Sequence, residues 1–267
     1  MSGPMQPRPR RYPFLLGTTS YIIAADIVPN ARFLAPRVDD IELVLFESDA
    51  VSNIPSASVM GELAAIAQCN GCGYTVHLPT DARCGCADEP QRRRYRDNAL
   101  RVIERTRPLA PRAYIVHCEG VERGAAPAEV CAWQERCIPT IEALAAQCGD
   151  PHFLAVENLG YPMEWNAAIR RVCHTSACLD VGHLWVQGVE RWEAHCRDVL
   201  AQTSVIHLHG VRDSRDHCSL AVMEEGPIRL FLDLLRTECY TGVVTLEIFS
   251  ERDFGESVSV VEELWER

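Results

Sequence analysis

Short apolar runs alternate with longer segments of helical periodicity along almost the whole chain. Each run is nearly continuous and rich in β-branched residues, as expected for parallel strands that are covered by helices. Polar residues occur mainly toward the C-terminal end of each run. The pattern predicts eight strands, over residues 14–22, 40–47, 73–79, 113–120, 153–160, 176–183, 204–211 and 242–249.

The segments between the runs carry apolar residues at helical spacing. The first connection is short, because Pro29 and Pro36 limit it to about two turns of helix. Residues 81–96 form a long connection into the third helix, and long loops at the strand ends of an α/β protein are often substrate lids. The later helices are predicted over 57–70, 98–107, 128–148, 162–173, 188–202, 227–239 and 256–266.

Eight alternations of strand and helix within one domain length predict a single (β/α)8 barrel of the α/β class. We place this domain at residues 13–267 and expect residues 1–12, which lack an apolar run, to form a disordered tail. The alternative fold is an open doubly wound sheet. That fold would normally bring a glycine-rich phosphate turn after its first strand, and no G-x-G-x-x-G occurs in the sequence.

Composition restricts the partners. The net charge is -11 and the sequence pI is about 5.3, which disfavours a nucleic-acid partner. No apolar run is long enough to cross a bilayer, so we expect no membrane partner. The 13 cysteines are odd in number and many lie inside helix or strand patterns. They are interpreted as reduced thiols of a cytoplasmic protein. Cys84 and Cys86 are interpreted as loop thiols, with a metal contact as the alternative.

Residues 176–185 draw attention first, because an apolar strand runs directly into Asp180 and then His183. Gly182 allows the chain to turn between them, so both side chains can converge on one cation or one substrate. This spacing alone is weak evidence, since an aspartate that caps a turn gives the same pattern.

The other predicted strand ends also carry ionisable residues, and this strengthens the interpretation of Asp180 and His183 as part of a binding site. In a (β/α)8 barrel the strand ends share one face, where the active site lies. So many ionisable groups in one place are costly without a cation or polar ligand. Carboxylates with imidazoles suit Zn(II), Mn(II), Fe(II) or Co(II). The strand-end residues are Glu47, His77, His117 with Glu119, Glu157 with Asn158, Asp180 with His183, His207 and His209, and Glu247.

This ordered series resembles the AP endonuclease and xylose isomerase-like TIM barrel superfamily, over residues 14–265. More narrowly, three segments resemble the cobamide-remodelling hydrolases, the CbiR family. They are Leu-Gly-Thr-Thr-Ser-Tyr-Ile-Ile with Asp-Ile-Val-Pro-Asn in residues 16–30, the run over 38–47, and His-Leu-His-Gly-Val-Arg-Asp over 207–213.

The resemblance implies a metal-dependent hydrolase of a small corrinoid substrate. The expected reaction is cleavage of the nucleotide-loop phosphodiester of cobamides such as cobalamin, which releases cobinamide phosphate and the riboside of the lower ligand. One or two divalent ions are implied. Glu157, Asp180, a strand-seven histidine and Glu247 would hold one ion, and Glu157 could bridge to a second ion held by His77 and His117.

The remaining roles follow from the same resemblance. His207 and His209 point the same way along a strand, so either can be the ligand. We expect His209 to be the ligand and His207 to contact substrate. His183 would bind substrate or a further ion, and Glu47 would orient water or act as a general base. Glu157 and Glu247 are also expected to be catalytic, and the aromatic residues expected to pack on a flat ligand are Tyr21 and Trp185.

Two other functions stay open. A sugar isomerase or epimerase would use one divalent ion, with Glu157 and Glu247 moving a proton. A corrinoid-binding protein without catalytic activity is the other alternative, and DNA repair is disfavoured by the charge. The sequence leaves the oligomeric state open.

Overall fold

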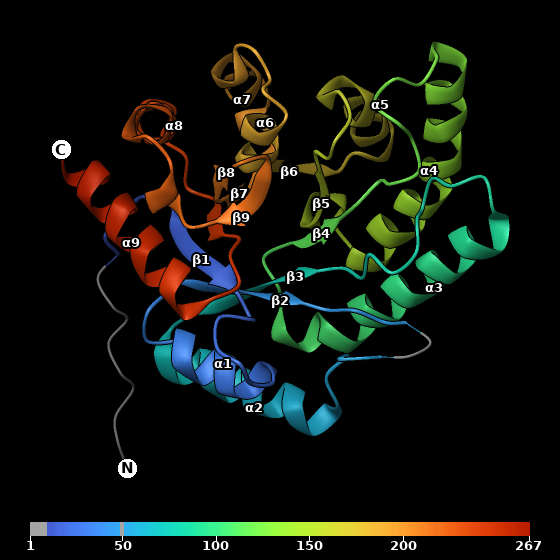
Figure 1. Ribbon diagram of the computed structural model, residues 1–267. Helices are drawn as coiled ribbons and strands as arrows, with labels where there is room; N and C mark the ends of the chain where they lie inside the picture. The colour runs from blue at the N-terminus through green and yellow to red at the C-terminus, as the bar shows by residue number, and fades with distance from the viewer. Residues whose placement is uncertain (1–9, 49–50) are drawn as a thin grey trace. The chain divides into compact units, whose positions relative to one another are not determined.

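The computed structural model describes residues 10–48 and 51–267. Its parallel strands close into a barrel in the order β1-β10-β7-β6-β5-β4-β3-β2, so the predicted (β/α)8 fold is confirmed. Strands and helices alternate along the chain from blue to red in Figure 1. The barrel strands are β1 (Leu15–Thr19), β2 (Asp40–Val44), β3 (Gly73–His77), β4 (Tyr114–Val116), β5 (Leu154–Glu157), β6 (Ser176–Asp180), β7 (Thr203–Leu208) and β10 (Val243–Leu246).

Each predicted helical segment contains a helix, and the two largest differences from the prediction are at the start of the third helix and directly after β6. The longer ones are α1 (Ile27–Leu34), α2 (Ala57–Asn70), α3 (Glu89–Thr106), α4 (Pro127–Cys148), α5 (Met163–Cys173), α7 (Trp192–Leu200), α8 (Glu225–Thr237) and α9 (Glu251–Glu266). Helix α3 begins nine residues earlier than predicted, with Pro90 in its first turn, where a proline costs no hydrogen bond. The second half of the connection 81–96 is therefore helix rather than loop.

The second difference is the short helix α6 (Val181–Val186), which begins immediately after β6. The backbone N–H of His183 donates to Oδ1 of Asp180 at 2.6 Å, so Asp180 caps the helix. His183 therefore lies in the first turn of a helix, whereas the apolar pattern predicted that the strand continued to residue 183.

Strand β7 ends at Leu208, and the residues after it form an antiparallel hairpin that the sequence pattern did not predict. The hairpin consists of β8 (Gly210–Arg212) and β9 (Arg215–Cys218), with Arg212 paired to Arg215. Its two-residue turn, Asp213 and Ser214, has positive φ at both positions, as tight hairpin turns require. The turn contains no glycine, so the usual signal for such a hairpin was missing.

The chain forms two compact units. Unit 1 comprises Met1–Glu42, Ala65–Gly73 and Leu179–Arg267, and unit 2 comprises Leu43–Ala64 and Tyr74–Cys178. In unit 1, β1 pairs in parallel with the first half of β2 and with β10. In unit 2, β4 pairs with β3 and β5, and β5 pairs with the first residues of β6.

Residues 11 and 12, which were expected to lie in a disordered tail, make contacts in the structure. Tyr12 is buried, stacks on Phe14 with ring centroids 4.8 Å apart, and meets Trp265 edge to face. Arg11 pairs with Glu262 and Glu266 of α9. Residues 11 and 12 therefore belong to the packed fold, Arg10 is exposed, and residues 1–9 of the predicted tail lie outside the described residues. Within the described chain, no helix combines the length and the apolar character that a membrane span needs.

Candidate metal-binding site

The predicted site residues fall into two groups, one in each unit. We call Asp180, His207 and Glu247, with their neighbour Glu42, the unit 1 group. We call His77, His117 and Glu157 the unit 2 group. The ligand atoms of Asp180, His207 and Glu247 lie within 4.8 Å of one another. The same holds for the ligand atoms of His77, His117 and Glu157.

His207 is the central residue of the unit 1 group. Its Nε2 atom lies 3.0 Å from Oε2 of Glu42, and its Nδ1 atom lies 3.1 Å from Oε2 of Glu247 and 4.0 Å from Oδ2 of Asp180. Metal-binding histidines usually donate one ring N–H to a carboxylate or carbonyl, which orients the other nitrogen toward the ion. His207 has this arrangement, with Glu42 as the acceptor.

His209 is placed differently. Its Nδ1 atom accepts the backbone N–H of His217 at 3.0 Å, and its Nε2 atom lies 3.2 Å from Oδ1 of Asp180. Because Nδ1 accepts, Nε2 carries the proton and donates to Asp180. Both nitrogens are thus engaged in holding the surrounding chain and the Asp180 carboxylate. The geometry favours His207 over the expected His209 as the ligand, and makes His209 a support for Asp180.

His217 extends the unit 1 group from the hairpin. Its Nε2 atom lies 3.3 Å from Oε2 of Glu247, and its Nδ1 atom lies 3.1 Å from Asp216. Burial opposes its positive charge, but Glu247 and Asp216 outweigh burial and raise the pKa of His217 to about 9. Its ring stacks on His209 with centroids 4.4 Å apart, and the ligand atoms of His183, His209 and His217 also lie within 4.8 Å of one another.

The unit 2 group repeats the arrangement of His207. His77 Nε2 and His117 Nε2 lie 3.6 and 3.0 Å from Oε2 of Glu157. On the far side of each ring, His77 Nδ1 is 3.0 Å from the carbonyl oxygen of Leu78, and His117 Nδ1 is 3.5 Å from Oε1 of Glu119. Each ring therefore has an acceptor on one nitrogen and directs the other nitrogen toward a buried carboxylate.

The pKa of His117 shows that the unit 2 group requires a positive charge beside its carboxylates. Burial alone would lower its pKa, but the nearby Glu157 and Glu119 carboxylates raise the pKa of His117 to about 10. Without another cation, a proton on His117 therefore offsets the buried charge of Glu157, which is 1% exposed. A divalent ion can replace that proton, and the oxygen and nitrogen donors suit Zn(II), Mn(II), Fe(II) or Co(II). The residues of both groups fit a metal of this kind.

Three other predicted site residues have neighbours of their own in the described chain. Glu47, predicted as a general base, pairs through Oε1 with Arg101 at 2.7 Å in unit 2. Trp185 lies on α6 and packs edge to face against Trp192, with ring centroids 5.5 Å apart. Tyr21 follows β1 and is half-buried. The catalytic role expected for Glu47 stays a prediction.

Sequence reasoning missed the contribution of Glu42. This residue is fully buried in β2, the strand for which Glu47 was chosen as the functional end. A signal was present, because a carboxylate inside an apolar strand is almost never buried without a partner. The importance of His217 was also missed, since the hairpin that returns it to His209 was not predicted.

Known proteins resemble this chain in sequence pattern and in fold. The family model described as "Xylose isomerase-like TIM barrel" matches residues 38–264. Among curated proteins, none matches the sequence. A D-tagatose 3-epimerase-like protein has a TM-score of 0.77 and 17% identity, covering 95% of this chain and 97% of its own.

Two further solved structures are similar. A 3-keto-D-glucoside 4-epimerase from E. coli has a TM-score of 0.69 and 16% identity, with 95% and 100% of the two chains covered. Endonuclease IV from Thermus thermophilus has a TM-score of 0.67 and 18% identity, with 93% and 99% covered. At these identities the likeness concerns the fold.

Proposed function

The chain belongs to the xylose isomerase-like TIM barrel family, and we propose that it is a metal-dependent enzyme that uses both ligand groups. The observation that carries this proposal is the orientation of three histidines, the buried His77 and His207 and the partly exposed His117. Each directs one ring nitrogen toward a carboxylate and has an acceptor on the other nitrogen. Active sites of (β/α)8 enzymes lie at the strand ends, which is where these residues occur in sequence.

Our preferred reaction is hydrolysis of a phosphodiester. The unit 2 group supports it, because His77 and His117 exceed the ligands that a single-ion isomerase needs. Two divalent ions would supply a water of lowered pKa and offset the charge that develops on the phosphate and the leaving oxygen. Asp180, His207 and Glu247 would hold one ion and His77, His117 and Glu157 the other, with Glu42 and Glu119 orienting the imidazoles.

The partly exposed histidines have a separate role in this proposal. His183 and His217 have side-chain exposures of 17% and 28%. They can therefore reach a bound substrate, while the unit 1 residues Asp180, His207 and Glu247 stay buried. A protonated His217 beside Glu247 would bind a phosphate oxygen or donate a proton to the leaving oxygen.

For the substrate we propose a cobamide, cleaved at its nucleotide-loop phosphodiester to cobinamide phosphate and a riboside. This part of the proposal rests on the sequence resemblance of residues 16–30, 38–47 and 207–213 to the cobamide-remodelling hydrolases. Trp185 and Tyr21 remain the proposed contacts for the flat corrin ring.

The second candidate is a sugar epimerase or isomerase, and the similar solved structures favour it, since several are named as sugar epimerases. In that reaction Glu157 and Glu247 would remove and return a proton beside a sugar carbonyl, and one ion would suffice. The two candidates differ because the hydrolase requires His77 and His117 to hold a second ion, whereas the single-ion epimerase does not.

The test is to incubate the protein, loaded separately with Mn(II), Fe(II), Co(II) or Zn(II), with adenosylcobalamin and with a panel of ketohexoses. Products are identified by mass spectrometry and chromatography. We expect cobinamide phosphate to form, and we expect Glu157→Ala and Asp180→Ala to abolish metal loading and turnover while the fold persists, because these residues lie at strand ends.

The double variant His77→Gln with His117→Gln separates the candidates. Phosphodiester hydrolysis should be lost, whereas a single-ion epimerase should retain most of its activity. Sugar turnover that survives this change would replace the hydrolase by the epimerase. Tight corrinoid binding without product under any metal would indicate a binding protein instead.

A further inference from the structure

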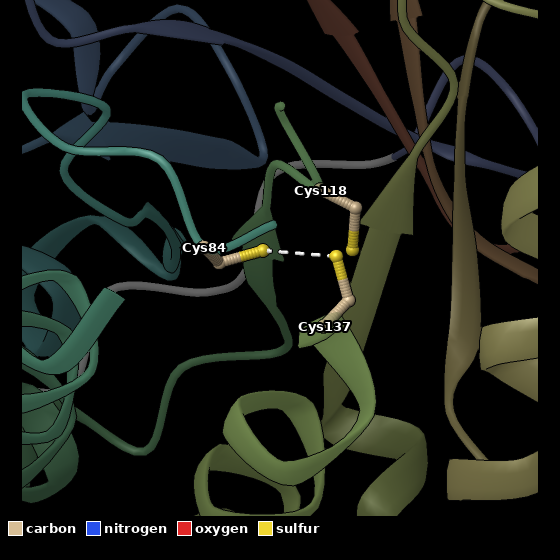
Figure 2. A group of neighbouring side chains, drawn as sticks. All are labelled: Cys84, Cys118 and Cys137. Carbon is tan, nitrogen blue, oxygen red and sulfur yellow. Dashed lines mark hydrogen bonds between the residues drawn. The ribbon is translucent and has the colours of Figure 1, made fainter. Parts of the chain in front are cut away.

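Three buried cysteines of unit 2 place their sulfur atoms together, apart from the ligand groups discussed above. Cys84 lies in the connection between β3 and α3, Cys118 follows β4, and Cys137 lies on α4. Their Sγ atoms all lie within 4.8 Å of one another, and Cys84 Sγ is 3.6 Å from Cys137 Sγ. Figure 2 shows the three side chains converging from separate segments of the chain. We call them the thiol cluster.

The thiol cluster is closed to solvent, since all three residues are 0% exposed. The surrounding backbone is fitted to it. Gly85 donates its N–H to the carbonyl oxygen of Glu119 at 2.9 Å, and a Cβ at Gly85 would come 2.7 Å from Cys137 Sγ. Only glycine can therefore follow Cys84 without displacing that sulfur. The Cys-Gly-Cys sequence is thus adapted to close approach of Cys84 to α4.

The spacing of the sulfurs is informative. A disulfide requires about 2.05 Å between its sulfurs, which is far shorter than the observed 3.6 Å. Thiolates bound to one Zn(II) at about 2.3 Å in tetrahedral geometry lie about 3.8 Å from one another. The cluster thus approaches the spacing of a shared ion without any rearrangement of the backbone.

The charge balance agrees with the geometry. Three thiolates buried together would repel one another, and they are costly without a cation. Arg136, whose Nε donates to the carbonyl oxygen of Gly85 at 2.7 Å, brings a fixed positive charge to this contact network.

We propose that the thiol cluster binds one thiophilic closed-shell metal ion, of which Zn(II) and Cu(I) are the two candidates. Thiolates select these ions over Mn(II), which prefers oxygen and nitrogen ligands. The bound ion would fasten the segment before α3 to α4 and to the end of β4. In the metal-free cluster, Cys84 Sγ donates to the carbonyl oxygen of His117 at 3.4 Å, and this hydrogen bond would be given up when Cys84 binds the ion as a thiolate. The cluster thus gives the chain a structural metal site separate from its carboxylate and histidine groups.

The experiment uses the full chain with its exposed cysteines replaced, Cys69→Ser, Cys131→Ser and Cys239→Ser, purified without oxygen. One equivalent of Zn(II) or Cu(I) is added, and X-ray absorption spectroscopy counts the sulfur neighbours of the metal. We expect three sulfurs for both ions. Zn(II) should keep a fourth, lighter neighbour, because it prefers four ligands, and Cu(I) should keep none.

Cys84→Ser and Cys137→Ser should each weaken binding by more than the about 10- to 100-fold that loss of a supporting contact causes. Cys196→Ser is the matched control, since Cys196 is equally buried but lies on α7 in unit 1. It should leave the sulfur signal unchanged. Circular dichroism checks the fold of each variant.

A second measurement does not depend on the variants. Cysteine alkylation in mild denaturant is followed by mass spectrometry with and without Zn(II), and the ion should protect Cys84, Cys118 and Cys137 but not Cys196. Metal bound only through nitrogen and oxygen would overturn the proposal. Equal protection of Cys196 would do the same, as would a Cys84–Cys137 disulfide in the protein as isolated.

Discussion

The Nε2 atom of His207 and the Oε2 atom of Glu42 lie 3.0 Å apart, and both side chains are fully buried. A buried carboxylate that accepts from an imidazole fixes the ring orientation and increases the basicity of the other ring nitrogen. In unit 1 that other nitrogen, Nδ1, lies between Glu247 and Asp180. Glu42 is therefore expected to orient the proposed ligand His207 without being a ligand itself.

Glu42→Gln tests this relationship. The glutamine can still accept from His207 but carries no charge, so we expect the metal affinity of the unit 1 group to fall by about 10- to 100-fold. Isothermal titration calorimetry with Mn(II) measures the change. Glu104→Gln, at an exposed position of α3, is the control and should leave the affinity unchanged. An unaltered affinity in Glu42→Gln would remove Glu42 from the site.

The two histidines of strand seven should behave differently. In His207→Gln the amide can still reach Glu42 from the Nε2 position, but the proposed ligand atom Nδ1 is lost, so the unit 1 group should lose its ion. His209→Gln can still donate to Asp180 from the Nε2 position and should retain the ion with reduced affinity. Native mass spectrometry of the metal-loaded variants counts the ions. Loss of the ion from His209→Gln and its retention in His207→Gln would reverse the assignment and restore His209 as the ligand.

The sequence predicted the barrel well because its strands and helices follow local rules of apolar spacing. Helix α2 begins and ends at the predicted residues, and all eight strands lie within or next to their predicted runs. The strand ends were predicted less well. The runs around Asp180 and His209 continue in apolar character while the backbone turns, because the apolar residues that follow are buried by tertiary contacts rather than by the strand ladder.

Site residues were predicted where they end a strand, as Asp180 and Glu157 do. The choice between His207 and His209 could not be made from spacing, since alternate residues of a strand share a face. It depended on Glu42 and His217, which are distant in sequence and reach these rings only through the fold. Such hydrogen-bond partners leave no local pattern beyond an isolated charge in an apolar strand.

Metal binding to the unit 2 group should release a proton. The pKa of His117 is raised to about 10 from 6.5 by Glu157 and Glu119 against the effect of burial. Between these two pH values the metal-free side chain is therefore protonated, whereas a ligand must be neutral. At pH 8 we expect about one more proton to be released by the wild type than by His117→Gln, and less as the pH rises through 10.

Calorimetry in two buffers of different ionisation enthalpy measures this release. The binding enthalpy of the wild type should depend on the buffer more strongly than that of His117→Gln. His117→Gln is compared at the same pH so that protons from His217 cancel in the difference. Equal buffer dependence of the two proteins would mean that the ion does not displace the proton of His117.

Gly182→Ala should damage the site although alanine favours helices. Gly182 lies in the first turn of α6, and a Cβ there would overlap the His209 ring. That ring donates to Asp180, so its displacement should move the ligand carboxylate. We expect a loss of stability of about 1–3 kcal/mol from overpacking, with weaker metal binding.

Gly61→Ala in α2 is the matched control, because nothing lies within 4 Å of its Cβ. It should stabilise the protein by about 0.5–1 kcal/mol. Chemical denaturation measures both changes, and an equal gain in stability in the two variants would show that His209 does not require glycine at residue 182.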